Sequence, residues 1–355
     1  MLGTDLYTAR KIYILFLAFS YVELGKLYRL IHLSSYDVCH ERCVYDPLRH
    51  VYRSGKLRLL KTVLSSSCSY DCLYCHNAWN RGVDSSPEEI ARLFSLMRSK
   101  GLVNGAFLSN SIKDPERSMD DILRAGEIIR RDFRGYIHLK IIPGCDRDQI
   151  KRAVEMASRV SMNIETPSSS LLTELCSTKS RSDFSRTLRF ALKYAKKRGV
   201  SFTTQMIAGL GEKDSQILRV ADRLYGMGVK RVYYSAFRPV SGTPLEGRRP
   251  ESRRRLVNLY RADALIRVYG FDPSEIEKAM TDGFLPKEDP KVVLALKKLE
   301  NGVKLSPLEV PGIGTKGASL IKSPEDLATL KRAGFSVKRA SAFHPSQKRI
   351  GDYIS

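Results

Sequence analysis

The sequence lacks any apolar run of the roughly 20 residues that a helix needs to cross a bilayer. Its nearest approach is IYILFLAFSYV, residues 12–22, which is shorter and has no convincing small-residue cleavage site after it. We read this stretch as a packed segment or an upstream extension, with a signal anchor as the alternative. The expectation is a cytoplasmic protein that does not associate with membranes.

Cysteine is scarce, and its distribution excludes a disulfide framework. The 355 residues include seven cysteines, an odd number, and they are clustered rather than spread along the chain. This usage favours a reducing compartment and metal-bound thiolates over a secreted fold. The sequence also lacks long internal repeats and low-complexity tracts. Its length then indicates one large domain with one or two small ones.

Acidic residues are few relative to basic ones. There are 38 Asp and Glu against 60 Lys and Arg, which gives a net charge of +22. Such an excess favours polyanionic partners, because each phosphate that a cation neutralises releases counterions. A general lysine and arginine bias of the proteome is the alternative, and charge alone does not exclude it.

Over much of its length the sequence alternates short apolar runs with amphipathic runs. Strands are predicted at 57–64, 104–109, 136–142, 160–165, 201–208 and 231–237. Helices are predicted from Ser86, with Glu89 completing a capping box, and near 118–132, 146–157, 183–198 and 214–226. Alternation implies parallel strands joined by helical crossovers, and thus an α/β fold built as a partial (β/α)6 barrel. Chemistry is expected at the carboxyl ends of its strands.

The alternation of strands and helices ends after FRPVSGTPLEGRRPESRRR, which contains five arginines between 248 and 255. Helices with breaks are expected over 251–300, followed by a glycine-punctuated helical tail. The predicted parts are an N-terminal extension at 1–55, the partial barrel at 56–245, a helical extension at 246–300, an all-α C-terminal module at 301–345 and a tail at 346–355.

The stretch SSSCSYDCLYCHN, residues 65–77, holds three cysteines within eight residues: Cys68, Cys72 and Cys75. They directly follow the first barrel strand, so their thiols are expected at the barrel mouth. A structural zinc site usually has four ligands, and no fourth is obvious here. An iron–sulfur cube held by three cysteines leaves one iron free to bind something else. An incomplete zinc site or a coincidence of three cysteines is the alternative.

This spacing resembles the CxxxCxφC motif of the radical S-adenosylmethionine (SAM) superfamily, in which φ is aromatic and is filled here by Tyr74. TQMIAGLGE, residues 204–212, resembles the superfamily's GxIxGxxE element on the fifth strand. The resemblance implies a [4Fe–4S] cluster on the three cysteines and SAM on the free iron. It also implies reductive cleavage of SAM to a 5′-deoxyadenosyl radical, with electrons from a donor such as ferredoxin or flavodoxin.

The resemblance extends to residues that would hold SAM. Glu165 at the end of the fourth strand is similarly placed to the residue that binds the ribose, and Gln205 and Gly209 lie in the fifth-strand element. Arg238, after the sixth strand, could reach the adenosine or a carboxylate. For Glu165 and Arg238 a structural ion pair is the alternative reading. No catalytic acid, base or radical relay is predicted.

One departure concerns the SAM amino group. Many members carry a Gly-Gly-Glu turn after the second strand, and this chain has Ser109 and Asn110 in LSNSIKD instead. Their polar groups and backbone carbonyls are the predicted substitutes.

Upstream, Cys39 and Cys43 in YDVCHERC are candidate ligands of an auxiliary cluster, with His40, Cys145 or Cys176 completing the set. Thiols without a metal are the alternative.

The segment VPGIGTKGASLI, residues 310–321, is predicted to be a helix-hairpin-helix. Pro311 would end a short helix, Gly312 and Gly314 would allow the tight turn, and a second helix would begin near Thr315. Backbone N–H groups there, with Lys316 beside them, would bind the phosphates of nucleic acid without reading sequence. A simple αα turn is the alternative.

Together these segments resemble a radical SAM subfamily that carries a C-terminal helix-hairpin-helix and is labelled as DNA modification or repair proteins. The implied function is a radical SAM enzyme that acts on DNA or RNA. Two alternatives stay open. One is a radical SAM enzyme that modifies a protein or a small molecule, with the hairpin as a docking or structural module. The other is a non-enzymatic zinc protein that binds nucleic acid.

Overall fold

The computed structural model describes residues 20–34, 44–46, 50–80 and 82–343. Cys39 and Cys43, the predicted auxiliary ligands, lie outside the described residues. The chain divides into two compact units. Unit 1 comprises residues 1–210 and 226–250, and unit 2 comprises residues 211–225 and 251–355. Within the described residues, no helix is both long and apolar enough to span a membrane.

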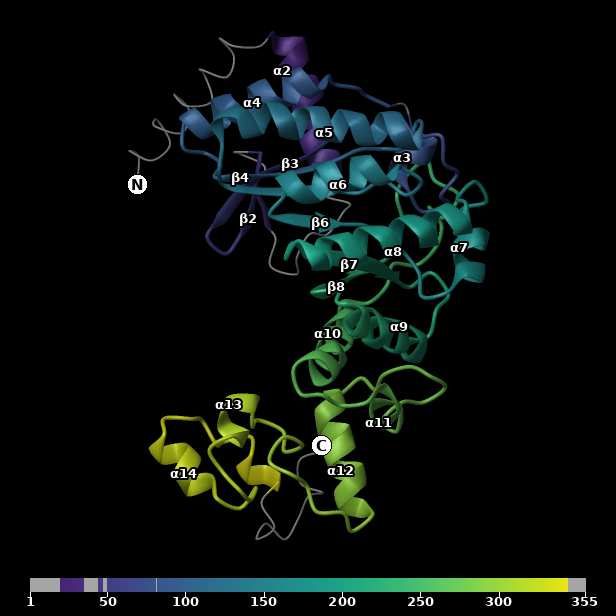
Figure 1. Cartoon of the computed structure of the whole chain (residues 1–355). Helices are drawn as coiled ribbons and strands as arrows, with labels where there is room; N and C mark the ends of the chain where they lie inside the picture. The colour runs from purple at the N-terminus through teal and green to yellow at the C-terminus, as the bar shows by residue number, and fades with distance from the viewer. Residues whose placement is uncertain (1–19, 35–43, 47–49, 81, 344–355) are drawn as a thin grey trace. The chain divides into compact units, whose positions relative to one another are not determined.

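Unit 1 is built on one eight-stranded sheet whose strands follow one another in sequence order (Figure 1). Its strands are β1 (Val44–Asp46), β2 (Val51–Ser54), β3 (Leu57–Val63), β4 (Gly105–Ser109), β5 (Tyr136–Lys140), β6 (Arg159–Ser161), β7 (Ser201–Ala208) and β8 (Arg231–Ala236). From β3 to β8 every neighbouring pair is parallel. These six strands confirm the predicted α/β partial barrel, because only crossover connections place consecutive strands side by side in parallel.

Two features of the sheet were not predicted. The strands β1 and β2 extend it by antiparallel pairing, with β2 joined to β3 through a turn at Gly55, whose φ is +59°. The strand β6 ends at Ser161, although a strand was expected to 165. Beyond it, Glu165 forms only a single bridge to Met206. Past Ser161 single hydrogen bonds to β7 persist, from Met162 to Thr203 and from Ile164 to Gln205, and at Glu165 the backbone turns into the left-handed region with a φ of +63°.

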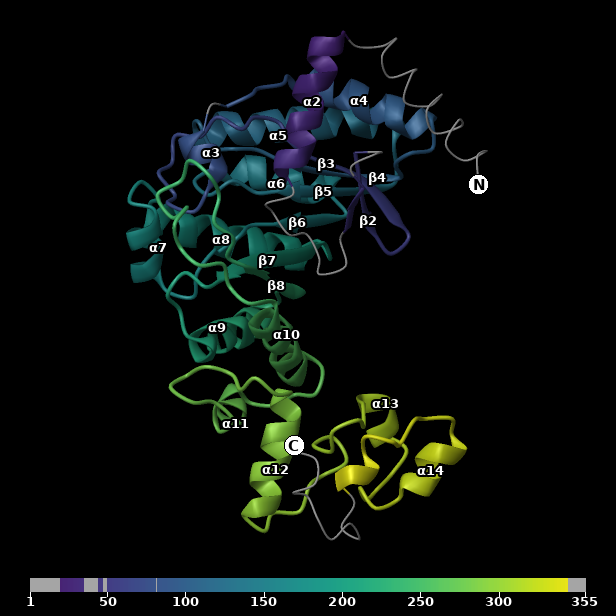
Figure 2. The same cartoon turned by 180° about the vertical axis from the view of Figure 1, so that it is seen from behind.

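Helices cover both faces of this sheet. Figure 1 shows α4 (Pro87–Ser99), α5 (Pro115–Asp132), α6 (Arg147–Met156) and α8 (Arg181–Lys197) on the near face, and Figure 2 shows α2 (Tyr21–Leu33) in front of β3 on the other. The capping box of Ser86 and Glu89 is present as predicted. Each amphipathic helix buries its apolar stripe against the sheet, as Ile122 and Ile129 of α5 do. The short helices α3 (His76–Trp79) and α7 (Ser169–Leu175) were not predicted.

Unit 2 is helical. Its helices are α9 (Asp214–Met227, which ends within unit 1), α10 (Arg253–Arg267), α11 (Pro273–Glu277), α12 (Pro290–Glu300), α13 (Thr315–Ala318) and α14 (Leu327–Arg332), followed by a 3-10 turn η2 (Ser341–Phe343). The C-terminal residues share an apolar core of their own, formed by Ala295, Leu305, Val310, Ile313, Ile321, Leu330 and Ala340. Because this core includes Ala295, the name C-terminal module is used from here on for residues 290–343 instead of the predicted 301–345.

The predicted hairpin is present only in part. The second helix begins at Thr315 as expected, but it is four residues long. The helix that Pro311 was expected to end does not form, because residues 307–309 are turns. Gly312 has a φ of +92°, and a Cβ there would lie 2.9 Å from Cβ of Arg339. Close packing and a left-handed backbone therefore explain this glycine without a ligand.

Candidate functional site

The three clustered cysteines occupy the loop that follows β3, at the carboxyl end of the parallel sheet where chemistry was expected. Cys72 is buried, whereas Cys68 and Cys75 are partly exposed. The loop turns tightly: the backbone N–H of Cys75 donates to the carbonyl of Cys72 over 3.0 Å. The same carbonyl accepts from the indole Nε1 of Trp79 over 2.9 Å. Two donors on one carbonyl fix the backbone between two of the cysteines.

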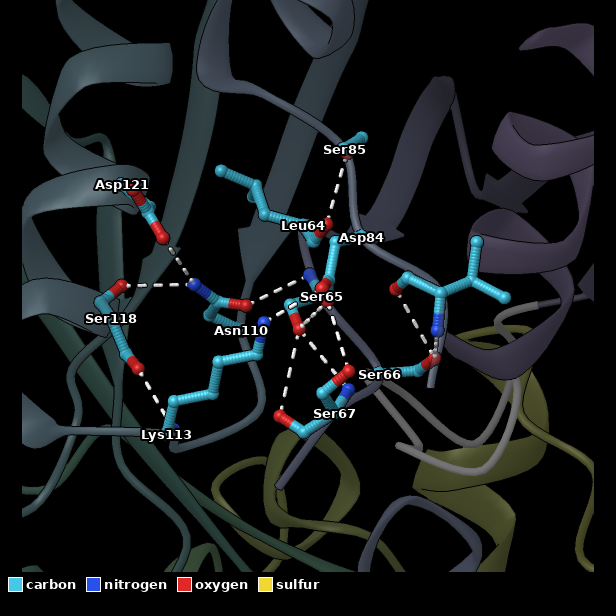
Figure 3. A network of polar contacts seen from close by, with 11 residues as sticks. Leu64, Ser65, Ser66, Ser67, Asp84, Ser85, Asn110, Lys113, Ser118 and Asp121 are labelled. Carbon is cyan, nitrogen blue, oxygen red and sulfur yellow. Dashed lines mark hydrogen bonds and ion pairs between the residues drawn. The ribbon is translucent and has the colours of Figure 1, made fainter. Parts of the chain in front are cut away.

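The serines that precede the cysteines are held by a polar network (Figure 3). The hydroxyl of Ser65 donates to the Asp84 carboxylate, and the hydroxyl of Ser67 donates to the same Oδ1 over 3.1 Å. Lys113 closes the network with an ion pair to Asp84 at 2.7 Å. The first turn of the loop is therefore fixed before Cys68 is reached.

Asn110 proves to be part of this network. Its Oδ1 accepts from the backbone N–H of Ser65 over 2.8 Å, and its Nδ2 donates to the carbonyl of Ser118 and to Asp121 (Figure 3). Ser109 donates its hydroxyl to the carbonyl of Thr62 over 3.2 Å. The side chains predicted to hold the SAM amino group thus join the strand ends to one another and to α5, a role that was not predicted.

A second segment, Leu175–Lys179, lies directly against the cysteine loop. The backbone N–H of Leu73 donates to the carbonyl of Leu175 over 2.9 Å. The thiols of Cys72 and Cys176 lie 3.2 Å apart. We call Leu175–Lys179 the buttress segment, because it contacts successive residues of the cysteine loop from the end of α7.

Asp71 holds the buttress segment against the cysteine loop by hydrogen bonds. Its carboxylate accepts from the backbone N–H and hydroxyl of both Ser177 and Thr178, and also from the Cys176 thiol. Burial by itself would raise the pKa of Asp71, but these hydrogen bonds hold it well below its usual range. The charged form of Asp71 is the one that the segment binds.

Beside the loop, Tyr74 fills a small apolar cluster with Leu175, Leu210 and Phe237. Burial raises its pKa well above the usual value. The Nζ of Lys179 lies 3.4 Å from the Tyr74 hydroxyl and over the ring of Tyr70. Burial disfavours the Lys179 cation, yet its pKa is raised because the thiols of Cys72, Cys176 and Cys75 and the carboxylate of Glu165 surround it. A single cation therefore faces the cysteine loop from the buttress segment.

The predicted SAM residues on the later strands gather at the same edge of the sheet. The carbonyl of Gln205 accepts from the backbone N–H of Glu165 over 3.0 Å, and Ile207 N–H donates to Glu165 over 2.7 Å. These bonds hold Glu165 in its left-handed conformation. The side chain of Gln205 is buried and donates to Ser235 over 3.1 Å. Gly209, at a φ of +104°, then ends the strand as only glycine readily does.

Two other candidates follow β8 and β5. Arg238 is exposed in the loop after β8 and forms no ion pair with any residue that the structure describes. Cys145, in the turn before α6, is buried, and burial raises the pKa of its thiol to about 12. Cys176, proposed with it as an auxiliary ligand, instead contacts the main cysteine loop.

The donor set of the loop suits an iron–sulfur cube. Its three thiols lie on one short loop at a strand end, which matches a cluster that takes one cysteine on each of three irons. Over the described residues, no three His, Cys, Asp or Glu side chains converge as ligands of one metal ion. Cysteine thiolates are the ligand type that iron–sulfur clusters take from proteins.

Comparison with known proteins agrees with this geometry. Residues 62–224, from β3 through α9, match the family described as the radical SAM superfamily. These residues form a radical SAM domain. Members of this superfamily are enzymes whose cofactors are a [4Fe–4S] cluster and SAM.

Relatives of this radical SAM domain are named as biotin synthases. The enzyme from Desulforudis audaxviator is 28% identical over 216 residues, which are 58% of this chain and 63% of that enzyme. The enzyme from Thermodesulfovibrio yellowstonii is 26% identical over 244 residues, 64% of this chain and 75% of that enzyme. The match to the first relative thus spans less than two thirds of its length. Among solved structures, methylornithine synthase (PylB) is 17% identical with a TM-score of 0.49, over 68% of each chain.

Proposed function

We propose that the protein is a radical SAM enzyme that acts on nucleic acid, with the cluster bound by Cys68, Cys72 and Cys75. The observation that carries the cluster assignment is the position of these three thiols on one loop at the carboxyl end of β3. When bound, the cluster and SAM supply a one-electron cleavage that yields a carbon radical from SAM. The chain's own residues position the cofactors and exclude side reactions.

The edge around the loop suits SAM. Glu165 holds a left-handed backbone that costs a non-glycine residue roughly 1–3 kcal/mol, and such strain is concentrated at functional sites. Its carboxylate would accept from the ribose hydroxyls, with Gly209 allowing the adenine to approach. Because the side chains of Ser109 and Asn110 are engaged with the sheet, backbone carbonyls of that turn would receive the amino group of SAM.

The cluster assignment is tested by anaerobic reconstitution of the full chain, followed by measurement of iron, sulfide and 5′-deoxyadenosine. The variant with Cys68, Cys72 and Cys75 all replaced by alanine should bind no cube and cleave no SAM. Cys145→Ala is the matched control, since this cysteine is buried away from the loop, and it should retain both. A triple variant that still cleaves SAM would refute the assignment.

The nucleic-acid proposal rests on the surface of the C-terminal module. Its exposed cations include Lys316, Lys322, Lys331, Arg332, Lys338 and Arg339. Two features that favoured nucleic-acid binding in the sequence support it less in the structure. Helix α13 is too short to offer a phosphate site at its N-terminus, and Arg255 of the arginine-rich segment is used up in a buried ion-pair cluster with Glu212, Asp214 and Glu251. The phosphates of nucleic acid would therefore contact lysine and arginine side chains and not the N-terminus of a helix.

Salt dependence tests this part of the proposal. The full chain should bind duplex DNA, single-stranded DNA or RNA with an affinity that falls steeply as salt rises. Lys316→Glu combined with Lys331→Glu should reduce the slope of log K against log salt by about 2, because each lost phosphate contact removes about 0.9. Lys193→Glu with Lys197→Glu, on α8, makes the same charge change elsewhere and should leave the slope unchanged.

A second candidate is a small-molecule substrate, and the names of the relatives favour it. Under this alternative the C-terminal module would be a structural or docking unit. Absence of nucleic-acid binding at low salt, together with intact SAM cleavage, would select it. Mass spectrometry of nucleic acids from cells with and without the gene would identify a modified nucleotide under the first proposal.

A further inference from the structure

The three-cysteine motif includes Cys72 but does not require Cys176, which contacts it. Cys176 lies 104 residues after Cys72, at the end of α7, yet the two sulfurs are 3.2 Å apart and both side chains are buried. The buttress segment is held in place by the backbone bond from Leu73 to Leu175 and by the Asp71 carboxylate. This contact therefore does not depend on the thiols themselves.

The thiol proton of Cys176 has three acceptors within reach. They are Oδ1 of Asp71 at 3.1 Å, Oγ1 of Thr178 at 3.6 Å and the sulfur of Cys72. Oδ1 of Asp71 already receives the backbone N–H of Thr178 at 3.1 Å and its hydroxyl at 2.7 Å. Because a carboxylate offers about four lone-pair sites over two oxygens, the Cys176 thiol is a third donor on Oδ1 and the weakest of the three. Thr178 Oγ1 is the most distant acceptor and already receives the N–H of Asp71.

The acceptor that the Cys176 thiol prefers changes when Cys72 binds iron. As a free thiol, Cys72 donates toward Cys176. As a cluster ligand it has no proton, and its sulfur becomes an anionic acceptor 3.2 Å from a thiol whose other acceptors are shared with stronger donors or more distant. Charge-assisted hydrogen bonds are the stronger ones, so the Cys176 S–H turns toward Cys72.

We propose that Cys176 is a positioning residue whose thiol donates a hydrogen bond to the cluster-bound sulfur of Cys72 and thereby raises the reduction potential of the cluster. Reduction adds negative charge to the cluster, and a donor on a ligand sulfur stabilises that charge. The inference rests on the proposed function, because it requires Cys72 to be a cluster ligand.

The test is a redox titration of the reconstituted full-length enzyme followed by electron paramagnetic resonance, with iron and sulfide measured in every sample. Cys176→Ala should bind as much iron and sulfide as the wild type, and its midpoint potential should shift downward beyond the scatter of replicate titrations. Cys176→Ser keeps an O–H donor at the same place, and its midpoint should lie closer to that of the wild type than the alanine variant's does.

Ser177→Ala is the matched control. It removes a hydroxyl that the buttress segment donates to Oδ2 of Asp71, while the acceptors open to the Cys176 proton stay the same. Its midpoint should equal that of the wild type. An equal shift in Ser177→Ala and Cys176→Ala would overturn the inference, because it would trace the effect to loosening of the segment.

Other results separate this inference from the proposed function. An unchanged midpoint in Cys176→Ala with a full cluster would overturn the inference alone. Loss of the cluster from Cys176→Ala, with Cys176→Ser equally empty, would also overturn it, since Cys176 would then be a ligand. A wild-type chain that binds no cluster, by iron content and spectrum, would overturn the proposed function and this inference with it.

Discussion

The carboxylate of Asp71 accepts the backbone N–H of Thr178 over 3.1 Å and its hydroxyl over 2.7 Å, although 107 residues separate the two. Asp71 sits immediately before Cys72, so this contact fixes the cysteine loop from outside the motif. A spacing motif states which residues are ligands. The Asp71–Thr178 contact holds one of those ligands in place.

Asp71→Asn should destabilise the protein by about 1–3 kcal/mol, because an amide cannot accept the set of hydrogen bonds that a carboxylate accepts here. The loss should appear as a lower midpoint in chemical denaturation of the apoprotein. Asp183→Asn is the control, because the carboxylate of Asp183 pairs with the neighbouring Arg186 on the same helix. Equal stability of the two variants would contradict the role assigned to Asp71.

Glu165 combines strain with a predicted ligand role, and substitution should separate the two. Glu165→Gly should keep or raise stability, by up to about 1 kcal/mol, because glycine adopts a φ of +63° without strain. Both Glu165→Gly and Glu165→Gln should bind SAM more weakly in equilibrium dialysis of the reconstituted enzyme. Unchanged SAM affinity in both variants would remove Glu165 from the site.

Arg255 is the centre of a buried ion-pair cluster in unit 2. It lies 2.8 Å from both Glu212 and Asp214, whose side chains are at most 1% exposed. Arg255→Met should cost about 3–5 kcal/mol, because it leaves buried carboxylates without a cation. Arg219→Met removes an ion pair whose arginine is 64% exposed, and should cost less than about 1 kcal/mol in the same denaturation experiment.

Two glycines of the VPGIGTKG segment should respond differently to alanine. Gly312→Ala should destabilise the protein by about 1–3 kcal/mol, since its φ is +92° and the added Cβ meets residues 339 and 340. Gly314→Ala should cost less than about 1 kcal/mol, because its φ is −91° and its nearest neighbour would be 3.8 Å away. Thermal unfolding of both variants measures the difference. A costly Gly314→Ala would show a constraint that packing does not explain.

Lys291 should make stability depend on pH. Burial lowers its pKa to about 8, while its Nζ donates to the carbonyl of Ile313 over 2.8 Å. Between pH 8 and about 10.4 the unfolded chain still binds the lysine proton and the folded chain does not. The free energy of unfolding therefore gains a contribution that rises with pH across this window, by about 1–3 kcal/mol. Lys291→Met should lack this rise when the two proteins are compared by denaturation at pH 7.5 and pH 10.

Much of the barrel was predictable, because the sequence patterns that indicate its strands and helices are formed by residues close together in the chain. Strands buried on both faces read as short apolar runs, and the helix caps at Ser86 and Asp146 are set by residues three positions apart. The left-handed turn at Glu165 was not predicted, because its bonds to Gln205 and Ile207 come from a neighbouring strand. No pattern near Glu165 in the sequence records those bonds.

The sequence by itself determined the cysteine spacing, the order of the parallel strands and the edge at which the site lies, because spacing and hydrophobic period are properties of adjacent residues. Only the tertiary structure decided which polar groups are already engaged. It placed Asn110 on Ser65, Arg255 among carboxylates, and Cys176 on Cys72. The physical reason is the same in each case: the partner lies tens of residues away, and folding alone brings it within hydrogen-bonding distance.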